Sequence, residues 1–258
     1  MDFFDQKLDI LRNIIEKGPF DIKRATSLLN DLKNTVYDSS FLSLSFSDIP
    51  LENQIKFREI LEFYSIICIR SRNLEGFHRS MEQLKSIYFH KGSGLPISPR
   101  MSLILSLNLA YFLSIEDFIE FNLELSIIES HISKDDPYLN YVRNLFEAIS
   151  DNSFLRLSSL ENSPPSPYFS QFTSDILAGA RNMHANTIEK SYPHMTVNQL
   201  SEILHFSSPA ETRQFILKRK WVITPDERVI FIKTDNSKPN VDIAVQSVKL
   251  AVQLSLLG

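Results

Sequence analysis

The sequence contains few of the residues on which several classes of fold and active site depend. Its single cysteine, Cys68, excludes an internal disulfide framework and a cysteine-rich zinc site. Only six of the 258 residues are glycine, and the chain has no P-loop, no dinucleotide-binding glycine motif and no nucleophile elbow. Its six histidines show neither an HExxH motif nor paired metal-ligand spacing. We therefore expect a non-catalytic protein that holds no cofactor and no metal.

Strong charge of one sign and long apolar runs are missing as well. The chain carries 27 basic and 31 acidic residues, and its net charge of −4 gives no overall attraction to nucleic acid. The longest apolar stretch, around Leu103 to Leu113, is interrupted by Ser106 and Asn108 and is too short to cross a bilayer. The first residues lack the basic-then-apolar layout of a signal sequence. We expect a soluble intracellular protein without a membrane segment.

Apolar residues make up 43% of the chain, and over residues 1–150 they recur with the period of a helix. The segment from Ser102 to Leu113 is apolar on nearly every side and predicts a central, buried helix. Short connections between antiparallel helices predict a TPR-like array of helical hairpins over residues 1–160, although no repeat consensus is visible. The amphipathic stripes are Phe4, Leu8, Leu11 and Ile15; Ala25, Leu28, Leu29, Leu32 and Val36; Ile60, Leu61, Tyr64 and Cys68; Leu74, Phe77, Met81, Leu84 and Tyr88; Phe118, Phe121, Leu125 and Ile128; and Tyr138, Tyr141, Val142, Leu145 and Ile149.

Two capping patterns mark helix starts in the second part of the chain. Thr196 with Gln199 three residues later is a capping-box pattern. Ser208 is a second N-cap, because Pro209 follows at the first helical position and Glu211 at the third. Both helices are short, and the second is expected to run to the basic residues before the only tryptophan.

The elements of residues 161–235 follow the order of a winged helix. A proline-rich connection, Leu160 to Phe169, precedes a helix that carries Phe172, and the two capped helices come next. Trp221 to Thr224 and Arg228 to Lys233 are then predicted to be strands, with a Pro-Asp-Glu turn between them. Helix, helix, helix and hairpin together predict a winged helix with a small β-hairpin.

Residues 236–258 are expected to form a loop and a last helix, from Val241 to Leu257, with two apolar faces. The polar residues of this helix gather in one narrow stripe between the faces. A helix on a protein surface needs only one apolar stripe, so two faces predict burial on both sides, most simply in a bundle of several helices. The candidate partner-binding residues are Val241, Val245, Val248, Val252 and Leu256 on one face, and Ile243, Leu250 and Leu254 on the other.

Lys218, Arg219 and Lys220 are the best local candidates for a basic contact. One interpretation is a phosphate contact or a nuclear-import signal, which keeps a winged-helix nucleic-acid-binding protein open as an alternative. The other, which we favour, is a helix end where cations complement the helix dipole. The aromatic side chains nearby are predicted to be core residues rather than base-stacking platforms: Phe215, Trp221 and Phe231.

The order of these parts, together with several stretches of sequence, resembles the PCI-domain family. The stretches are FHRSMEQLKSIYF, LPISPRMSLILSLNLAYFLS with the following DFIEFNLELSII, SPYFSQFTSDILAGARNMHANTIEKSYPHMTVNQLSEILHF, and RQFILKRKWVITPDERVIFI. They cover most of residues 74–235 and are most similar to the subunits of this family in the lid of the proteasome regulatory particle. None of them is catalytic, so the resemblance is specific by its extent and order. The N-terminal 70 residues and the tail match only in pattern.

The resemblance implies a non-catalytic scaffold subunit for ubiquitin-dependent protein degradation. In the family, the winged helices of several subunits pack side by side through their hairpin sheets, and the C-terminal helices gather into a bundle. It therefore implies other PCI-domain lid subunits as partners, Val229 and Phe231 as hairpin residues at the contact, and a location in the cytoplasm and nucleus. Small PCI subunits also occur in the COP9 signalosome and in translation initiation factor 3, and both remain open as alternatives.

Overall fold

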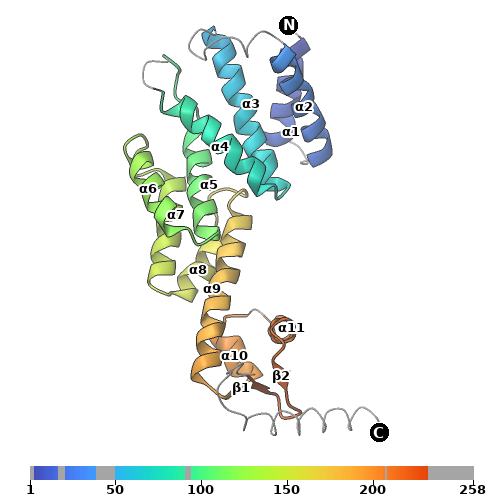
Figure 1. Cartoon of the computed structure of the whole chain (residues 1–258), viewed down its shortest axis with the longest axis vertical. Helices are drawn as coiled ribbons and strands as arrows, with labels where there is room; N and C mark the ends of the chain where they lie inside the picture. Colours follow the sequence, from blue (N-terminus) through green and yellow to red (C-terminus); the bar gives the residue numbers. More distant parts are fainter. Residues whose placement is uncertain (1–2, 17–20, 39–49, 91–93, 207, 232–258) are drawn as a thin grey trace. The chain divides into compact units, whose positions relative to one another are not determined.

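The computed structural model describes residues 3–16, 21–38, 50–90, 94–206 and 208–231. Within these ranges the chain is mainly helical and has one small sheet, which confirms the predicted fold class (Figure 1). The elements are α1 (Phe3–Glu16), α2 (Ile22–Asp38), α3 (Leu51–Arg70), α4 (Leu74–Tyr88), α5 (Met101–Ser114), α6 (Phe118–Glu129), α7 (Pro137–Ser150), α8 (Phe154–Asn162), α9 (Ser170–Ser191), β1 (His194–Thr196), α10 (Val197–Ile203), α11 (Pro209–Lys218), β2 (Val222–Ile223) and β3 (Arg228–Ile230).

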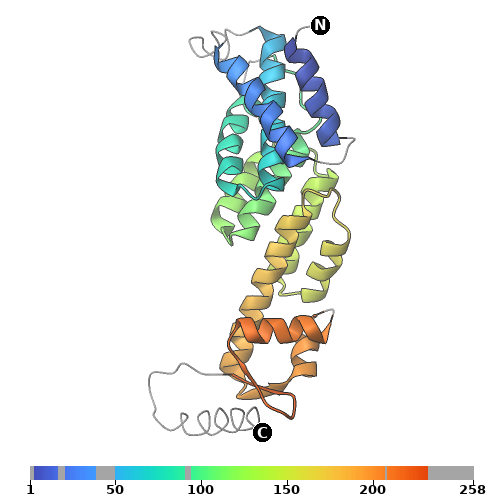
Figure 2. The same ribbon diagram turned by 90° about the vertical axis from the view of Figure 1, so that its right-hand side faces the viewer.

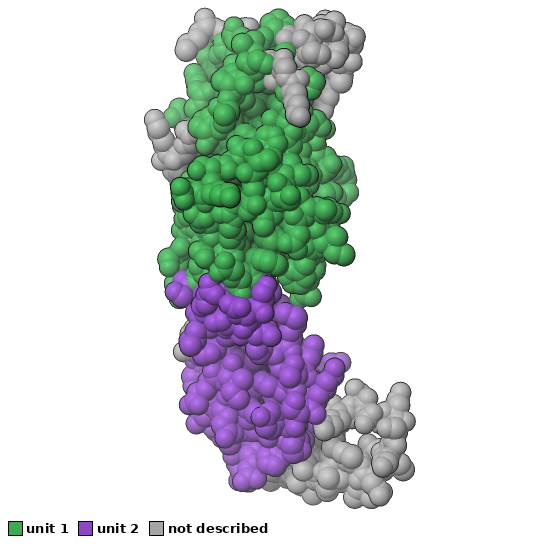
Figure 3. Space-filling model, turned by 90° about the vertical axis from the view of Figure 1, so that its left-hand side faces the viewer, with its two compact units in different colours: residues 1–147, 160–176 green, residues 148–159, 177–258 purple. Residues whose placement is uncertain are grey.

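The chain divides into two compact units, which Figure 3 shows in different colours. Unit 1 comprises residues 1–147 and 160–176, and unit 2 comprises residues 148–159 and 177–258. The helix α9 supplies residues to both units, up to Ile176 in unit 1 and from Leu177 in unit 2. These units are defined by compactness. The division into functional parts at residues 160 and 235 stays a prediction.

The first three helices of unit 1 share one apolar cluster, to which α1 and α2 contribute their predicted stripes as far as Leu32, while α3 contributes Ile60 and Tyr64 of its predicted stripe together with residues outside it. Tyr168, from the proline-rich connection, packs against the same cluster, and its hydroxyl donates to the carbonyl of Ile15 over 3.4 Å. The connection is therefore part of the packing of unit 1. Each fully buried leucine or isoleucine contributes roughly 1.5–3 kcal/mol to that packing. The buried members of the cluster are Leu8, Leu11, Ile15, Ala25, Leu29, Leu32, Ile60, Phe63, Ile66 and Ile67.

Two helices of the array are buried on several sides. The predicted central helix, α5, is one of them, with Ile104, Leu107 and Leu109 nearly inaccessible to solvent. The C-terminal half of α3 is the other, although its sequence predicts only one buried stripe; Phe63 and Ile69 lie outside that stripe and are buried too. Helix α3 packs against both α2 and α4, so one stripe does not describe all of its buried surface.

One three-residue turn recurs after α3, α5 and α7. The second residue of each turn has a left-handed backbone. It is Arg72 after α3 (φ 57°), Glu116 after α5 (φ 61°) and Asn152 after α7 (φ 52°). In each turn the amides of the second and third residues donate back to the helix in the Schellman pattern. The third residue starts the next helix, and in the first two turns its side chain, that of Asn73 or Asp117, is the N-cap. The repeat of the array is therefore visible in its turns.

Unit 2 contains the winged-helix elements in the expected order. Figures 1 and 2 show α10, α11 and the strands gathered around the C-terminal half of α9. The sheet has the strand order β1-β3-β2 with antiparallel pairing, and Val222 lies opposite Ile230 and Ile223 opposite Val229. The predicted hairpin is confirmed up to Ile230, while its expected end at Lys233 lies outside the described residues.

Strand β1 and helix α8 are absent from the sequence prediction. Strand β1 has three residues between a helix end and a capping box, which is too short for an alternating pattern. Helix α8 has nine residues, of which Phe154 and Leu157 are buried, so its apolar stripe is weak. Both elements are defined by their neighbours more than by their own sequence.

Candidate protein–protein interface

The winged-helix core of unit 2 is closed by aromatic side chains. Trp221 is 5% exposed and packs edge-on against Phe231, with ring centroids 4.7 Å apart. Phe215 lies 6.0 Å from the Trp221 ring in a similar edge-on arrangement and is partly buried. The prediction that these rings are core residues is confirmed, and Trp221 and Phe231 have no open face on which a nucleic-acid base would stack.

Both predicted N-caps are present. The hydroxyl of Thr196 accepts from the Gln199 amide at 3.2 Å, and the Gln199 side chain accepts from the Thr196 amide at 3.1 Å, which completes a reciprocal capping box. The hydroxyl of Ser208 accepts from the Glu211 amide at 3.3 Å, with Pro209 at the first helical position. These caps determine where α10 and α11 begin and so where each presents its exposed face.

Arg219, the middle residue of the basic cluster, is engaged within unit 2. Its Nη1 donates to Asn186 Oδ1 at 2.8 Å and lies 3.5 Å from Glu189 Oε2, and its Nη2 donates to the Asn182 carbonyl at 3.0 Å. The guanidinium also lies over two aromatic rings of the core. Arg219 therefore ties the end of α11 to α9.

Lys218 and Lys220 are exposed at the end of α11. Lys218 stands in the last turn, where a cation complements the helix dipole. Lys220 has a left-handed backbone, with φ of 59°, and belongs to the turn that ends the helix. Two exposed lysines release few counterions, so they support only weak, salt-sensitive contact with nucleic acid. The positions of the two lysines agree with the interpretation that they complement the end of the helix. A contact with phosphate stays a hypothesis.

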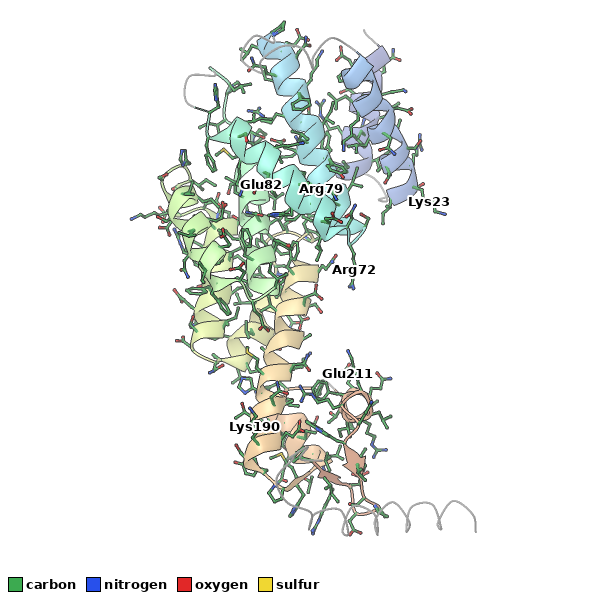
Figure 4. The ribbon with its side chains drawn as sticks, in the orientation of Figure 1. Lys23, Arg72, Arg79, Glu82, Lys190 and Glu211 are labelled. Atoms are coloured by element: carbon green, nitrogen blue, oxygen red, sulfur yellow. The ribbon has the colours of Figure 1, made fainter. Side chains whose placement is uncertain are left out.

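Two further charges of unit 2 complement the dipoles of helix ends. Figure 4 labels Lys190, in the last turn of α9, and Glu211, in the first turn of α11, and both side chains are exposed. Each has the sign that opposes the dipole at its helix end. These two charges therefore stabilise helix ends and do not by themselves indicate a site for an anionic ligand.

The hairpin residues expected at the partner contact lie inside unit 2. Val229 is fully buried and Phe231 is 4% exposed, and β3 is the central strand of the sheet, bonded on both sides. The edges of the sheet are β1 and β2. Tyr192, which is 51% exposed, and the exposed His194 lie at the start of the β1 edge. Val229 and Phe231 are not exposed to a partner in the described structure, and their role in binding stays a prediction.

The remaining candidate partner-binding residues lie outside the described residues. They are Val241, Ile243, Val245, Val248, Leu250, Val252, Leu254 and Leu256.

The rest of the described chain offers little for chemistry. No group of three or more His, Cys, Asp or Glu side chains in that part is placed to hold a metal ion, and none of its helices is long and apolar enough to cross a membrane. Cys68 is 2% exposed, and burial raises the pKa of its thiol, against the weaker opposing effects of Tyr64 and Lys33. A buried thiol with a raised pKa is unreactive, as predicted for a core residue.

One exposed feature of unit 1 was missed in the sequence. The sequence predicted the buried face of α6, which includes Phe121 and Ile128. It gave no role to Ile119, Leu123 and Ile127. The spacing of four between these three residues was the available signal. They form a second apolar face, which is exposed.

An array of helical hairpins followed by a winged helix is a PCI-type fold. The sequence profile of the CSN8/PSMD8/EIF3K family matches residues 99–241, more than half of the chain, and the chain belongs to this family. It is 29% identical over 186 residues to the 26S proteasome regulatory subunit rpn12 of Schizosaccharomyces pombe, which covers 72% of this chain and 67% of that protein. It is 28% identical over 200 residues to the 26S proteasome regulatory subunit RPN12 of Saccharomyces cerevisiae. That match covers 76% of this chain and 72% of that protein. It is 25% identical over 229 residues to the 26S proteasome non-ATPase regulatory subunit 8 homolog A of Arabidopsis thaliana. That match covers 86% of this chain and 84% of that protein.

Proposed function

We propose that the chain is a non-catalytic scaffold subunit of the lid of the 26S proteasome regulatory particle. In this role it assembles with other PCI-domain subunits and serves ubiquitin-dependent protein degradation. The observation that carries the proposal is its similarity to proteins named as 26S proteasome regulatory subunits from fungi, a plant and a nematode, which cover between 72% and 92% of the chain. Their names describe regulatory subunits, which supports a role in assembly rather than catalysis.

The proposal divides the chain into three parts with different tasks. Residues 1–160 form the helical array, residues 161–235 form the winged helix that packs beside the winged helices of neighbouring subunits, and residues 236–258 supply a loop and a helix for a bundle. The exposed edges of the sheet, β1 and β2, support side-by-side packing, because β3 is already paired on both sides. The two apolar faces in the sequence of Val241 to Leu257 support the bundle.

Affinity purification of the tagged full-length chain from its own cells, followed by quantitative mass spectrometry, tests this function. We expect to recover subunits of the proteasome lid and base in amounts comparable to the tagged chain. Cells that express the untagged chain serve as the control and are expected to yield none of these subunits. Recovery of COP9 signalosome or initiation factor 3 subunits instead would assign the chain to another branch of its family. Recovery of nucleic-acid enzymes alone would support the winged-helix nucleic-acid binder, whose basis is Lys218 and Lys220.

The location that goes with this function is the cytoplasm and nucleus. A fluorescent fusion of the chain is expected in both compartments, with the same distribution as a tagged lid subunit. A fusion confined to another compartment would contradict the proposed assembly.

A further inference from the structure

The helix α6 has a second apolar face that no described residue covers. Ile119, Leu123 and Ile127 are 76%, 57% and 46% exposed, and the spacing of four makes them neighbours along one side of the helix. Ile115, in the turn before α6, is 47% exposed as well. Single exposed aliphatic residues are ordinary on a protein surface, whereas a contiguous row marks a surface that binds something. We call Ile119, Leu123 and Ile127 the α6 stripe.

The opposite face of α6 already holds the helix in unit 1. Phe121 is fully buried and stacks on Phe146 of α7, with ring centroids 4.7 Å apart, and Ile128 is fully buried too. On the same side Glu124 Oε1 accepts from Lys85 Nζ of α4 at 2.6 Å. Figure 1 shows α6 at the edge of the helical unit, with α5 on its inner side. The α6 stripe is therefore not needed to keep α6 in place.

Among the described residues, the charges beside the stripe that have no ion-pair partner are acidic, whereas Glu124 and Glu129 of α6 are paired with Lys85 and Arg143. Glu120 lies beside it on α6 and Glu116 lies in the preceding turn; both are exposed, and neither forms an ion pair within the part of the chain that the structure describes. The sequence has no lysine or arginine from Met101 to Glu129. Asn122 and Ser126 occupy the other flank and are exposed. A partner thus meets an apolar row with negative charge along one flank.

We propose that the α6 stripe docks an amphipathic helix of another protein, with apolar residues at helical spacing and lysine or arginine on the flank that meets Glu116 and Glu120. A straight apolar row on a helix fits the apolar face of a second helix, because side chains spaced by three and four interdigitate. The unpaired acids select a basic flank by charge complementarity. A second copy of α6 brings the same acids and no cation, so it is a poor match. This surface belongs to unit 1 and does not depend on the proposed assembly.

Two synthetic helical peptides test the surface directly. Both carry leucine at positions i, i+4 and i+7, and one has a lysine flank where the other has glutamate. We expect the lysine peptide to bind the full chain in fluorescence anisotropy, and Leu123→Asp to weaken it by about tenfold or more, the value of one buried leucine. Leu155→Asp is the matched control, because Leu155 is 70% exposed on α8. Equal binding of the two peptides, or equal loss in the two variants, would contradict the proposal.

A charge reversal sharpens the same test. The double variant Glu116→Lys, Glu120→Lys is expected to bind the glutamate peptide better than the lysine peptide. It is expected to stay folded with a small loss of thermal stability, because both side chains are exposed but Glu120 complements the dipole in the first turn of α6. If the folded double variant keeps its preference for the lysine peptide, charge on this flank does not select the partner and the proposal is wrong.

Photo-crosslinking identifies the occupant in the assembled protein. Leu123 is replaced by benzoylphenylalanine in the tagged full chain, the complex is purified and irradiated, and the crosslinked segment is sequenced. A helical segment of another subunit with basic residues supports the proposal. A crosslink to residues 241–258, to a second copy or to an acidic segment overturns it. A chain that enters no complex contradicts the proposed function, while the peptide measurements still decide the α6 stripe.

Discussion

Five helices in the described residues end in a left-handed residue that is not glycine. These residues close Schellman motifs after α3, α5, α7, α10 and α11, with two backbone amides donating back to each helix. A side chain with a Cβ costs roughly 1 kcal/mol in this conformation, least for asparagine. The chain thus forms its tight turns with little glycine and accepts backbone strain at each. The residues are Arg72, Glu116, Asn152, His205 and Lys220.

At the scale of the residue, Arg72→Gly is expected to stabilise the chain. Removing the Cβ relieves the left-handed backbone, and after the entropy that glycine adds to the unfolded state a gain of about 0.5 kcal/mol remains. Arg72 is exposed, as Figure 4 shows, so few side-chain contacts are lost. Arg72→Ala is the control; it removes the same side chain but keeps the Cβ and is expected to give no gain. Urea unfolding measures both, and equal effects would disprove the backbone explanation.

A second residue-scale prediction concerns the N-cap of α11. Ser208→Ala leaves the Glu211 amide without its acceptor and is expected to lower the unfolding free energy by ~1 kcal/mol. Ser208→Asp keeps an acceptor and adds a charge that complements the helix dipole, so it is expected to lose little or nothing. Thermal unfolding of the two variants compares them. A similar loss in both would show that the hydroxyl is needed for something other than capping.

At the scale of the element, Arg219 is expected to stabilise the packing of α11 against α9. Arg219→Ala removes the bonds to Asn182 and Asn186 and the contact with Glu189, and is expected to cost about 2 kcal/mol of unfolding free energy. Lys218→Ala, one residue earlier and exposed, is expected to cost less than about 0.5 kcal/mol. Denaturant unfolding followed by Trp221 fluorescence measures both. A larger loss of unfolding free energy for Lys218→Ala than for Arg219→Ala would show that Arg219 does not hold α11 against α9.

The buried carboxylate of Glu62 predicts a dependence on pH. Glu62 is 1% exposed, and its Oε1 accepts from the Tyr88 hydroxyl at 2.9 Å, which joins the end of α4 to α3. Burial, together with the charge of Glu62, raises the pKa of Tyr88. Above a pH of about 10 an unfolded tyrosine loses its proton while Tyr88 in the folded chain keeps it, so the unfolding free energy falls as the pH rises.

The variant Tyr88→Phe tests this linkage. At neutral pH it is expected to lower the unfolding free energy by ~1–3 kcal/mol, because Glu62 loses a buried donor. Above a pH of about 10 its stability is expected to fall less steeply than that of the unaltered chain, since one linked proton is gone. Urea unfolding at a series of pH values measures the two slopes. Parallel slopes would mean that Tyr88 titrates alike in both states.

At the scale of the whole molecule, deletion of residues 241–258 is expected to separate folding from assembly. The polar stretch TDNSKPN separates this segment from the winged helix, so few contacts are expected to cross the boundary and the truncated chain is expected to keep its unfolding transition. Loss of several apolar side chains from a helical bundle, each worth roughly 1.5–3 kcal/mol when buried, is expected to abolish stable incorporation. Thermal unfolding and co-elution with the assembled complex measure the two effects. A truncated chain that unfolds outright would place this segment in the chain's own core.

Single substitutions provide the controls for the deletion. Val248→Asp and Leu250→Asp change the two predicted apolar faces, and each is expected to weaken incorporation if both faces are buried between subunits. Lys249→Ala lies on the predicted polar stripe and is expected to have little effect. Normal incorporation of either aspartate variant would remove that face from the interface.

The sequence by itself determined the helical class, the order from helical array to winged helix, and the starts of α10 and α11. These features depend on periodicity and on caps such as Thr196 and Ser208, which act over a few neighbouring residues. Only the tertiary structure decided that α6 keeps a second apolar face exposed, because α5 and Phe146 of α7 pack against the predicted face and no described residue covers Ile119 or Leu123. It also decided that Arg219 is used within unit 2 and that His194–Thr196 is a strand. Such outcomes depend on side chains and strands that are distant in the chain, and local sequence does not encode them.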